Sequence, residues 1–137
     1  MGRLSILVIE DDRDILEILT YSLGEAGYDV LTAEDGELGL RLALQKRPNL
    51  VLLDVGLPKI GGLDVCRALR ENPDKSIAKI PIVMLTALTS DVDRVIGKVL
   101  GANSYLNKPF SSVELIDHIS RHIHAAQTSF ETSFGTR

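Results

Sequence analysis

The sequence ILVIEDD at residues 6–12 places three acidic residues directly after four apolar ones. An unbroken run of Val, Ile and Leu of this length predicts a short β-strand that is covered on both faces, as in a parallel sheet. The sequence LVLLD at residues 50–54 repeats the pattern, with Asp54 at its end. Parallel strands end at the same edge of a sheet, so these acidic side chains are expected to lie near one another.

Two further apolar runs end in polar residues of other kinds. Residues 82–85 (IVML) are followed by Thr86, and residues 105–106 (YL) are followed by Asn107 and Lys108. Carboxylates, a hydroxyl and an ammonium group at one sheet edge form a site for a divalent cation and a phosphoryl group. The expected cation is Mg²⁺, which suits a few carboxylates, waters and a phosphoryl oxygen.

Helical patterns alternate with the strands. The clearest has apolar residues at i, i+3, i+4, i+7 and i+8, namely Val92, Val95, Ile96, Val99 and Leu100. Five strands alternating with five helices predict an α/β fold with a parallel, doubly wound, flavodoxin-like sheet of order 2-1-3-4-5 and helices on both faces. In that order the first and third strands are neighbours, so Asp11 and Asp54 should face each other, with Thr86 and Lys108 on the same rim.

The length of 137 residues predicts one domain with a buried core. This domain is expected to span residues 1–124. Its last helix is expected to bury four apolar residues, Val113, Ile116, Ile119 and Ile123. Residues 125–137 are rich in Ser and Thr without an apolar period, and are expected to form a flexible tail or a linker.

Composition and charge disfavour several classes of protein. The net charge is −4 and no cluster of Lys and Arg is present, which argues against direct binding of nucleic acid. No apolar run approaches the roughly 18 residues that a membrane span needs, and no signal peptide is evident. The one cysteine, Cys66, excludes an internal disulfide and fits a reducing compartment, so the expected location is the cytoplasm. Cys66 itself is predicted to be a buried thiol.

Each candidate residue also has an ordinary structural explanation. Acidic residues at the start of a helix complement its dipole, Asp54 could cap a turn, and a lone Thr86 is more often structural. Their joint placement at four strand ends favours a functional site. His118 and His122 lie one helical turn apart, as in a zinc-binding pair, but no third ligand has matching spacing. Solvent-exposed helix residues are therefore the favoured interpretation of this pair.

Taken together and in this order, Glu10-Asp11, Asp54, Thr86-Ala87 and Lys108-Pro109-Phe110 resemble the receiver domain of two-component response regulators. The resemblance covers roughly residues 4–124. It implies a signalling domain that at most catalyses its own phosphorylation and dephosphorylation, rather than a turnover enzyme.

The resemblance also implies a role for each matching residue. Asp54 is similar to the phosphoacceptor, and Asp11 to the direct Mg²⁺ ligand. Glu10 would act on the metal largely through water, and Gly56 would offer its backbone carbonyl. Lys108 would pair with the phosphoryl group and precede a cis peptide bond to proline.

Two further residues match the family's switch. Thr86 resembles the hydroxyl that contacts the phosphoryl group, and Tyr105 the aromatic residue whose rotation follows it. The phosphoryl donor would be a sensor histidine kinase or a histidine phosphotransfer protein. The surface of the fourth helix, fifth strand and fifth helix would then change its affinity for an output domain, an effector protein or a second copy in a homodimer.

The sequence departs from the family pattern at two places. Glu10 replaces the commoner Asp, which preserves the charge. Residues 102–104 (ANS) stand where the winged-helix transcription-factor subclass usually has an acidic pair, which argues against a dimer joined by those charges. Gly56 and Leu88 occupy positions that tune self-dephosphorylation. Gly56 offers no side chain to position water and Leu88 could screen the site, so a long-lived phosphoryl group is expected.

Other functions fit the sequence less well. Mg²⁺-dependent aspartyl phosphatases of similar topology favour a second Asp two residues after the nucleophile, where Gly56 stands here. No GxGxxG motif follows the first strand, as a dinucleotide-binding domain requires, and no GKS or GKT motif of a GTPase is present. A receiver-like module that is never phosphorylated remains an alternative, although the intact acidic set disfavours it.

Overall fold

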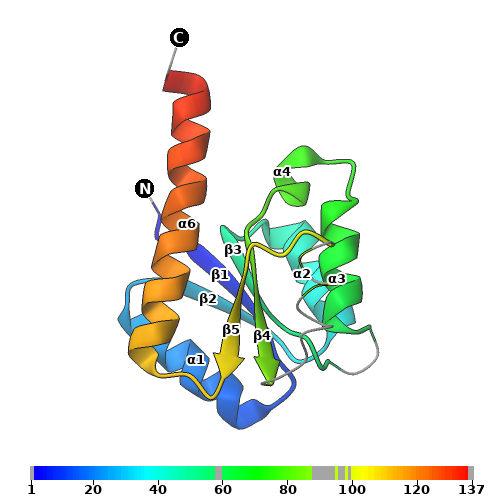
Figure 1. Cartoon of the computed structure of the whole chain (residues 1–137), viewed down its shortest axis with the longest axis vertical. Helices are drawn as coiled ribbons and strands as arrows, with labels where there is room; N and C mark the ends of the chain where they lie inside the picture. Colours follow the sequence, from blue (N-terminus) through cyan, green and yellow to red (C-terminus); the bar gives the residue numbers. More distant parts are fainter. Residues whose placement is uncertain (1, 58–59, 88–94, 96–97, 99, 136–137) are drawn as a thin grey trace.

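The computed structural model of the chain describes residues 2–57, 60–87, 95, 98 and 100–135. Its centre is a sheet of five parallel strands in the order β2-β1-β3-β4-β5 (Figure 1). The strands are β1 (Ser5–Ile9), β2 (Asp29–Ala33), β3 (Leu50–Asp54), β4 (Ile82–Ala87) and β5 (Ser104–Lys108). The predicted strand order is therefore confirmed, and β1 and β3 are neighbours in the sheet.

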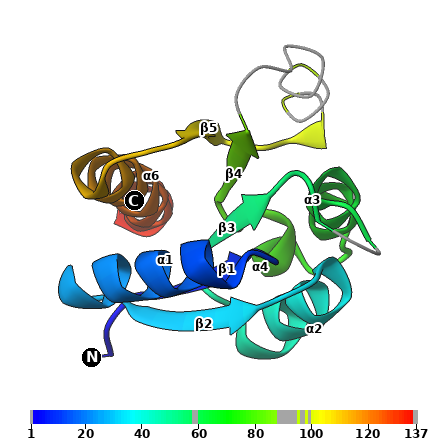
Figure 2. The same ribbon diagram turned by 90° about the horizontal axis from the view of Figure 1, so that it is seen from below.

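Helices cover both faces of this sheet, as Figure 2 shows. The described helices are α1 (Arg13–Glu25), α2 (Gly36–Lys46), α3 (Gly62–Arg70), α4 (Lys75–Ala78) and α6 (Ser112–Gly135). Leu19 of α1 and Ile119 of α6 pack with Val8 of β1 in one core layer, while Val65 of α3 packs with Leu7 of β1 in the other. β3 is buried along its whole length, because both faces of this central strand meet helices.

Much of the predicted helix at residues 92–100 lies outside the described residues, including Val92, Ile96 and Val99. Val95 and Leu100 are described and helical. Val95 is exposed, and Leu100 packs against the core layer next to α3.

α6 differs from its prediction in one of the residues that it buries. Val113 is 79% exposed, and Leu115 lies buried in its place with Ile119 and Ile123. These three residues follow one another at intervals of four, so they form one stripe along the helix. The helix continues to Gly135 and projects beyond the sheet (Figure 1). The flexible tail or linker expected at residues 125–137 stays a prediction. The domain boundary at residue 124 stays a prediction.

α4 is a short helix in the segment before β4. Asp74 caps it by accepting hydrogen bonds from the backbone N–H and the hydroxyl of Ser76, at 2.9 and 2.7 Å. Ile77 then points into the core and is 3% exposed. One cap and one buried residue are enough for a single helical turn, which leaves no periodic signal in the sequence.

The described helices include none that is both long enough and apolar enough to cross a membrane.

Candidate functional site

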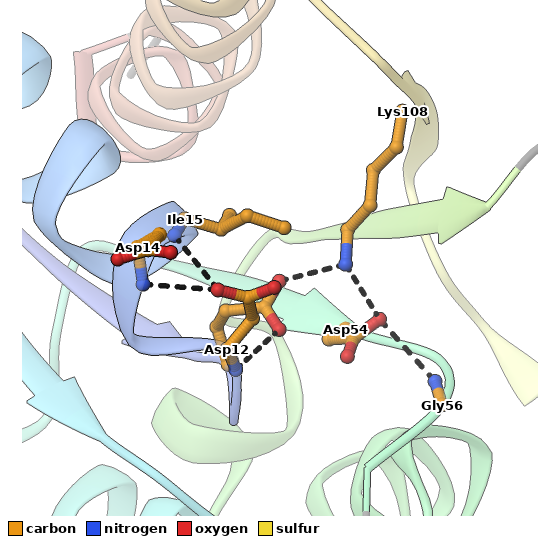
Figure 3. Close-up of polar contacts among 7 residues, drawn as sticks. Asp12, Asp14, Ile15, Asp54, Gly56 and Lys108 are labelled. Carbon is orange, nitrogen blue, oxygen red and sulfur yellow. Dashed lines mark hydrogen bonds and ion pairs between the residues drawn. The ribbon is translucent and has the colours of Figure 1, made fainter.

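The three consecutive acidic residues after β1 have three different environments. Glu10 is fully buried, and its backbone N–H continues the sheet by donating to the carbonyl of Ala33 at 3.0 Å. Asp11 is exposed. Asp12 is the N-cap of α1 and accepts hydrogen bonds from the backbone N–H groups of Asp14 and Ile15, at 2.9 and 3.2 Å (Figure 3). Helix capping therefore explains the acidic residue at position 12, but not those at positions 10 and 11.

Asp54 is the last residue of β3 and lies opposite Leu85 of β4 in the sheet register. Its side chain lies at the carboxyl end of the parallel strands, and the residue is only 6% exposed. The backbone N–H of Gly56 donates to its Oδ1 atom at 3.3 Å (Figure 3). The turn that follows β3 therefore orients one oxygen of the carboxylate.

Carboxylate oxygens of Glu10, Asp11 and Asp54 lie within 4.8 Å of one another. No other group of three or more His, Cys, Asp or Glu side chains comes this close among the residues that the structure describes. Two unit charges about 4 Å apart repel by roughly 4 kcal/mol at an effective dielectric constant near 20. A divalent cation would relieve this repulsion, so the cluster is a candidate cation site.

Lys108 supplies the one nearby positive charge among the described residues. Its Nζ atom lies 2.8 Å from Oε1 of Glu10 and 3.4 Å from Oδ1 of Asp54 (Figure 3). The predicted cis peptide bond between Lys108 and Pro109 is confirmed. Since β5 is separated from β1 by β4 and β3, the lysine side chain reaches over two strands to contact Glu10.

Burial and the ion pair together set the pKa values of Glu10 and Lys108. Burial raises the pKa of Glu10 above its ordinary value of 4.5, and the hydrogen bonds from Lys108 and from the backbone of Asp12 offset part of that rise. Burial alone would lower the pKa of Lys108, but the bond to Glu10 and the charge of Asp54 outweigh it, so the pKa is raised. Lys108 is therefore an ammonium ion that neutralises part of the cluster.

The donor set fits a hard cation such as Mg²⁺. All three candidate side chains offer carboxylate oxygens, which are the ligands that Mg²⁺ prefers. Oε1 of Glu10 is buried and, apart from its ion pair with Lys108, has no aligned hydrogen bond. One ammonium facing three carboxylates leaves a net negative charge, which also favours a divalent ion.

The remaining predicted site residues are Thr86, Gly56, Tyr105 and Leu88. Thr86, near the end of β4, is 4% exposed and lies one position beyond the register partner of Asp54. Gly56 contacts Asp54 through its N–H, as described above. Tyr105 is three positions before Lys108 in β5 and is half-buried, so it lies outside the cluster. Leu88 lies outside the described residues.

Tyr105 instead lines a cavity of about 300 Å³ between β5 and α6, together with Asp117, His118 and Arg121. The sequence predicted that His118 is solvent-exposed, but the structure shows it half-buried. Its Nε2 atom contacts the hydroxyl of Ser104. Its ring centroid lies 5.3 Å from that of His122, which is also half-buried. Burial and the neighbouring His122 and Arg121 lower the pKa of His118.

Arg70, which the sequence did not single out, ties three segments of the chain together. Its guanidinium donates to four oxygens, namely the carbonyls of Ala78, Ile80 and Gly101 and Oδ1 of Asn103, at 2.9, 2.7, 2.8 and 2.7 Å. Its position in the last turn of α3 is one where a basic residue commonly complements the helix dipole at the surface. The sequence therefore held no sign of this role.

Lys108→Met should lower the free energy of unfolding of the metal-free protein by up to about 3.5 kcal/mol at pH 7. The unpaired, buried Glu10 avoids its charge by taking up a proton, which costs about 1.4 kcal/mol per pH unit above 4.5. The pKa of Glu10 in the folded variant is raised, so the loss grows as pH rises and disappears toward pH 4.5. Urea unfolding in EDTA at pH 5 and pH 7 measures it, with the exposed Lys79→Met as control. Equal losses at both pH values would contradict this account.

A parallel β-sheet covered by helices, with acidic residues and a lysine at the carboxyl ends of its strands, defines a narrow class of proteins. The sequence profile of the response regulator receiver domain matches residues 6–120, and the chain belongs to this family. Receiver domains are signalling domains of two-component systems rather than turnover enzymes.

The chain is 46% identical over 110 residues to the alkaline phosphatase synthesis transcriptional regulatory protein PhoP of Bacillus subtilis (strain 168). The match covers 80% of this chain and 44% of PhoP, so the chain spans less than half of that relative. The structure resembles chemotaxis protein CheY4 of Vibrio cholerae, with a TM-score of 0.83, 31% identity and coverage of 88% and 99% of the two chains.

A second structural relative is the receiver domain of a sensor histidine kinase from Pseudomonas aeruginosa PAO1. The TM-score is 0.81 at 31% identity, and the match covers 90% of this chain and 99% of that one. That domain has a magnesium ion coordinated in its active site cleft.

Proposed function

We propose that Asp54 accepts a phosphoryl group from a phosphohistidine in a reaction that depends on Mg²⁺. The observation that carries this proposal is the convergence of Glu10, Asp11 and Asp54 within 4.8 Å, with the ammonium of Lys108 at 3.4 Å from Asp54. The family and the relatives support it. The donor would be a sensor histidine kinase or a histidine phosphotransfer protein, in the cytoplasm.

In this reaction an oxygen of Asp54 forms a bond to phosphorus. The bond from phosphorus to the histidine nitrogen breaks, and its electron pair returns to the imidazole. When bound, Mg²⁺ would neutralise charge on the phosphoryl oxygens. Glu10, Asp11, Asp54 and the carbonyl of Gly56 are the groups that would hold it.

Lys108 has two roles in this scheme. Before the reaction its ammonium pairs with Glu10 and Asp54, as the distances of 2.8 and 3.4 Å show. After the reaction it pairs with the transferred phosphoryl group, because that group carries more negative charge than the carboxylate it replaces.

The phosphorylated state would be transmitted to a surface through Thr86 and Tyr105. Thr86 would donate its hydroxyl to a phosphoryl oxygen, and Tyr105, which lines the cavity next to α6, would change its orientation. The resulting population shift would alter the surface formed by residues 92–100, β5 and α6. That surface would bind an output domain, an effector protein or a second copy of the chain.

Incubation with acetyl phosphate and Mg²⁺ tests the proposed function. The expected result is stable labelling of the protein to a limit of one phosphoryl group per chain, and no labelling in EDTA. Continuous release of phosphate without accumulation of labelled protein would instead indicate a phosphatase.

The phosphoryl group should persist for minutes or longer after the donor is removed. Gly56 has no side chain that could orient an attacking water, and a Cβ atom added there would meet nothing within 4 Å. The decay of phosphorylated protein on a phosphate-affinity gel measures the lifetime. Gly56→Asn, which adds a polar side chain there, should shorten it several-fold. Loss of the label within seconds from the unaltered protein would refute this expectation.

A further inference from the structure

α3 begins in direct contact with the backbone of the residue proposed to carry the phosphoryl group. A Cβ atom at Gly62 would lie 2.2 Å from the carbonyl oxygen of Asp54 and 2.8 Å from Cα of Val55. The N–H of Gly62 donates to the carbonyl of Val55 at 3.3 Å. The space between the first residue of the helix and the last residue of β3 is therefore too small for a Cβ atom.

α2 makes a similar contact with the segment that leads into α3. A Cβ atom at Gly36, the first residue of α2, would lie 2.2 Å from the carbonyl oxygen of Ile60 and 3.1 Å from its carbonyl carbon. It would also lie 3.0 Å from Cγ2 of Val65 in α3. Two helices therefore begin with a glycine that packs against the connection between β3 and α3.

These close approaches involve backbone atoms, which cannot move aside by a change of rotamer. α3 is held along the same face as Gly62, where Val65 and Leu69 are fully buried, and α2 is held by the buried Ala43. A methyl group at Gly62 would have to displace the end of β3 or the start of the helix by roughly 1 Å to restore van der Waals contact. The end of β3 is where Asp54 lies.

The other glycines of this segment lack such contacts. Nothing lies within 4 Å of a Cβ atom at Gly56, and the nearest atom to one at Gly61 is Oδ2 of Asp64 at 3.6 Å. Gly61 has φ −68° and ψ 161°, which any residue adopts. The requirement for glycine therefore belongs to Gly62 and Gly36 and is not a general property of the segment.

We infer that Gly62 is a positioning residue for Asp54, and that Gly36 supports it from α2. The absence of a side chain at position 62 lets α3 set the place of the Asp54 backbone, and thereby the distance from its carboxylate to Glu10, Asp11 and Lys108. This inference rests on the proposed role of Asp54. Displacement of a reacting group by about 1 Å can cost on the order of 10²-fold in rate.

Gly62→Ala and its neighbour Gly61→Ala form the test pair, because both add one methyl group to the same segment. Mg²⁺ affinity is measured from the rise in Tm with Mg²⁺ concentration, and the phosphorylation rate from labelling by acetyl phosphate. Both are corrected for the folded fraction from circular dichroism. Gly62→Ala should lose at least about tenfold in affinity and rate, while Gly61→Ala stays within about twofold of the unaltered protein.

A folded Gly62→Ala variant with unchanged Mg²⁺ affinity and rate would overturn the inference, as would equal losses in both variants. If Gly62→Ala is mostly unfolded, the measurements are made in sucrose, which favours the compact state. Gly36→Ala then provides a second test variant, in which Mg²⁺ affinity and phosphorylation rate should each fall by about threefold or more. Failure of the unaltered protein to become labelled would refute the proposed function instead, and the Mg²⁺ affinities would still decide the role of Gly62.

Discussion

Asp54→Asn should abolish phosphorylation by acetyl phosphate, with a fall in rate of at least about 10³-fold. The amide has nearly the shape of the carboxylate but lacks the anionic oxygen that forms the bond to phosphorus. The substitution also removes one of three clustered negative charges, so the metal-free fold should be retained. Mass spectrometry of the intact chain and a phosphate-affinity gel measure the outcome.

Asp12→Asn is the matched control for this prediction. It makes the same chemical change at a residue that caps α1 and does not belong to the carboxylate cluster. Asn caps helices about as well as Asp, so this variant should fold normally and be phosphorylated within a few-fold of the original rate. Labelling of Asp54→Asn at an undiminished rate would show that the phosphoryl group is carried elsewhere.

Asp11→Asn should remove most of the Mg²⁺ affinity, by about 10²-fold, and leave the metal-free stability almost unchanged. Asp11 is the exposed member of the cluster, so its charge has little structural role to lose. For the unaltered protein, Mg²⁺ at a hundred times its Kd should stabilise the fold by about 2.7 kcal/mol. Thermal unfolding with Mg²⁺ and with EDTA measures this stabilisation, which should largely vanish in the variant.

Asp14→Asn provides the comparison for Asp11→Asn. It removes an exposed carboxylate in the first turn of α1 that is absent from the cluster. The Mg²⁺-dependent rise in Tm should persist in that variant. If Asp11→Asn shows the same rise, Asp11 is not a metal ligand and the cation is held by Glu10 and Asp54 without it.

The sheet and the acidic cluster could be predicted from the sequence because both follow from local patterns. Apolar runs without polar interruption require strands that are covered on both faces, and alternation with helices leaves few topologies. Once β1 and β3 are neighbours, Asp11 and Asp54 have to meet at the shared edge. The cis bond at Pro109 was expected from the family resemblance and is confirmed.

The partner of Lys108 was harder to predict. The sequence indicated a pair with the phosphoryl group that Asp54 would carry, but Lys108 lies closer to Glu10 than to Asp54, at 2.8 Å compared with 3.4 Å. A lysine side chain has four flexible methylene groups and can reach either carboxylate. Burial decides between them, because Glu10 is completely enclosed and a counter-charge there relieves a larger desolvation cost. Burial of that kind is a property of the assembled fold.

The errors in α6 and at His118 have the same origin. An apolar period shows that a helix has a buried side, but the angle at which the helix docks decides which residues at the edge of that side are covered. Leu115 is buried and Val113 is not, although both are apolar. The contact of His118 with Ser104 depends on how α6 lies against β5, two elements that touch only in the folded chain.

The four hydrogen bonds of Arg70 have a consequence for the native-state fluctuations of the chain. The guanidinium of Arg70, at the end of α3, binds residues that follow the start of α4 and residues that precede β5. Asn103 also accepts a hydrogen bond from the backbone N–H of Ile82. If the guanidinium leaves, four acceptors each lose one hydrogen bond at once, so none of these segments can fray independently at low cost. They should open and close as a single cooperative unit, although they lie as much as 33 residues apart along the chain.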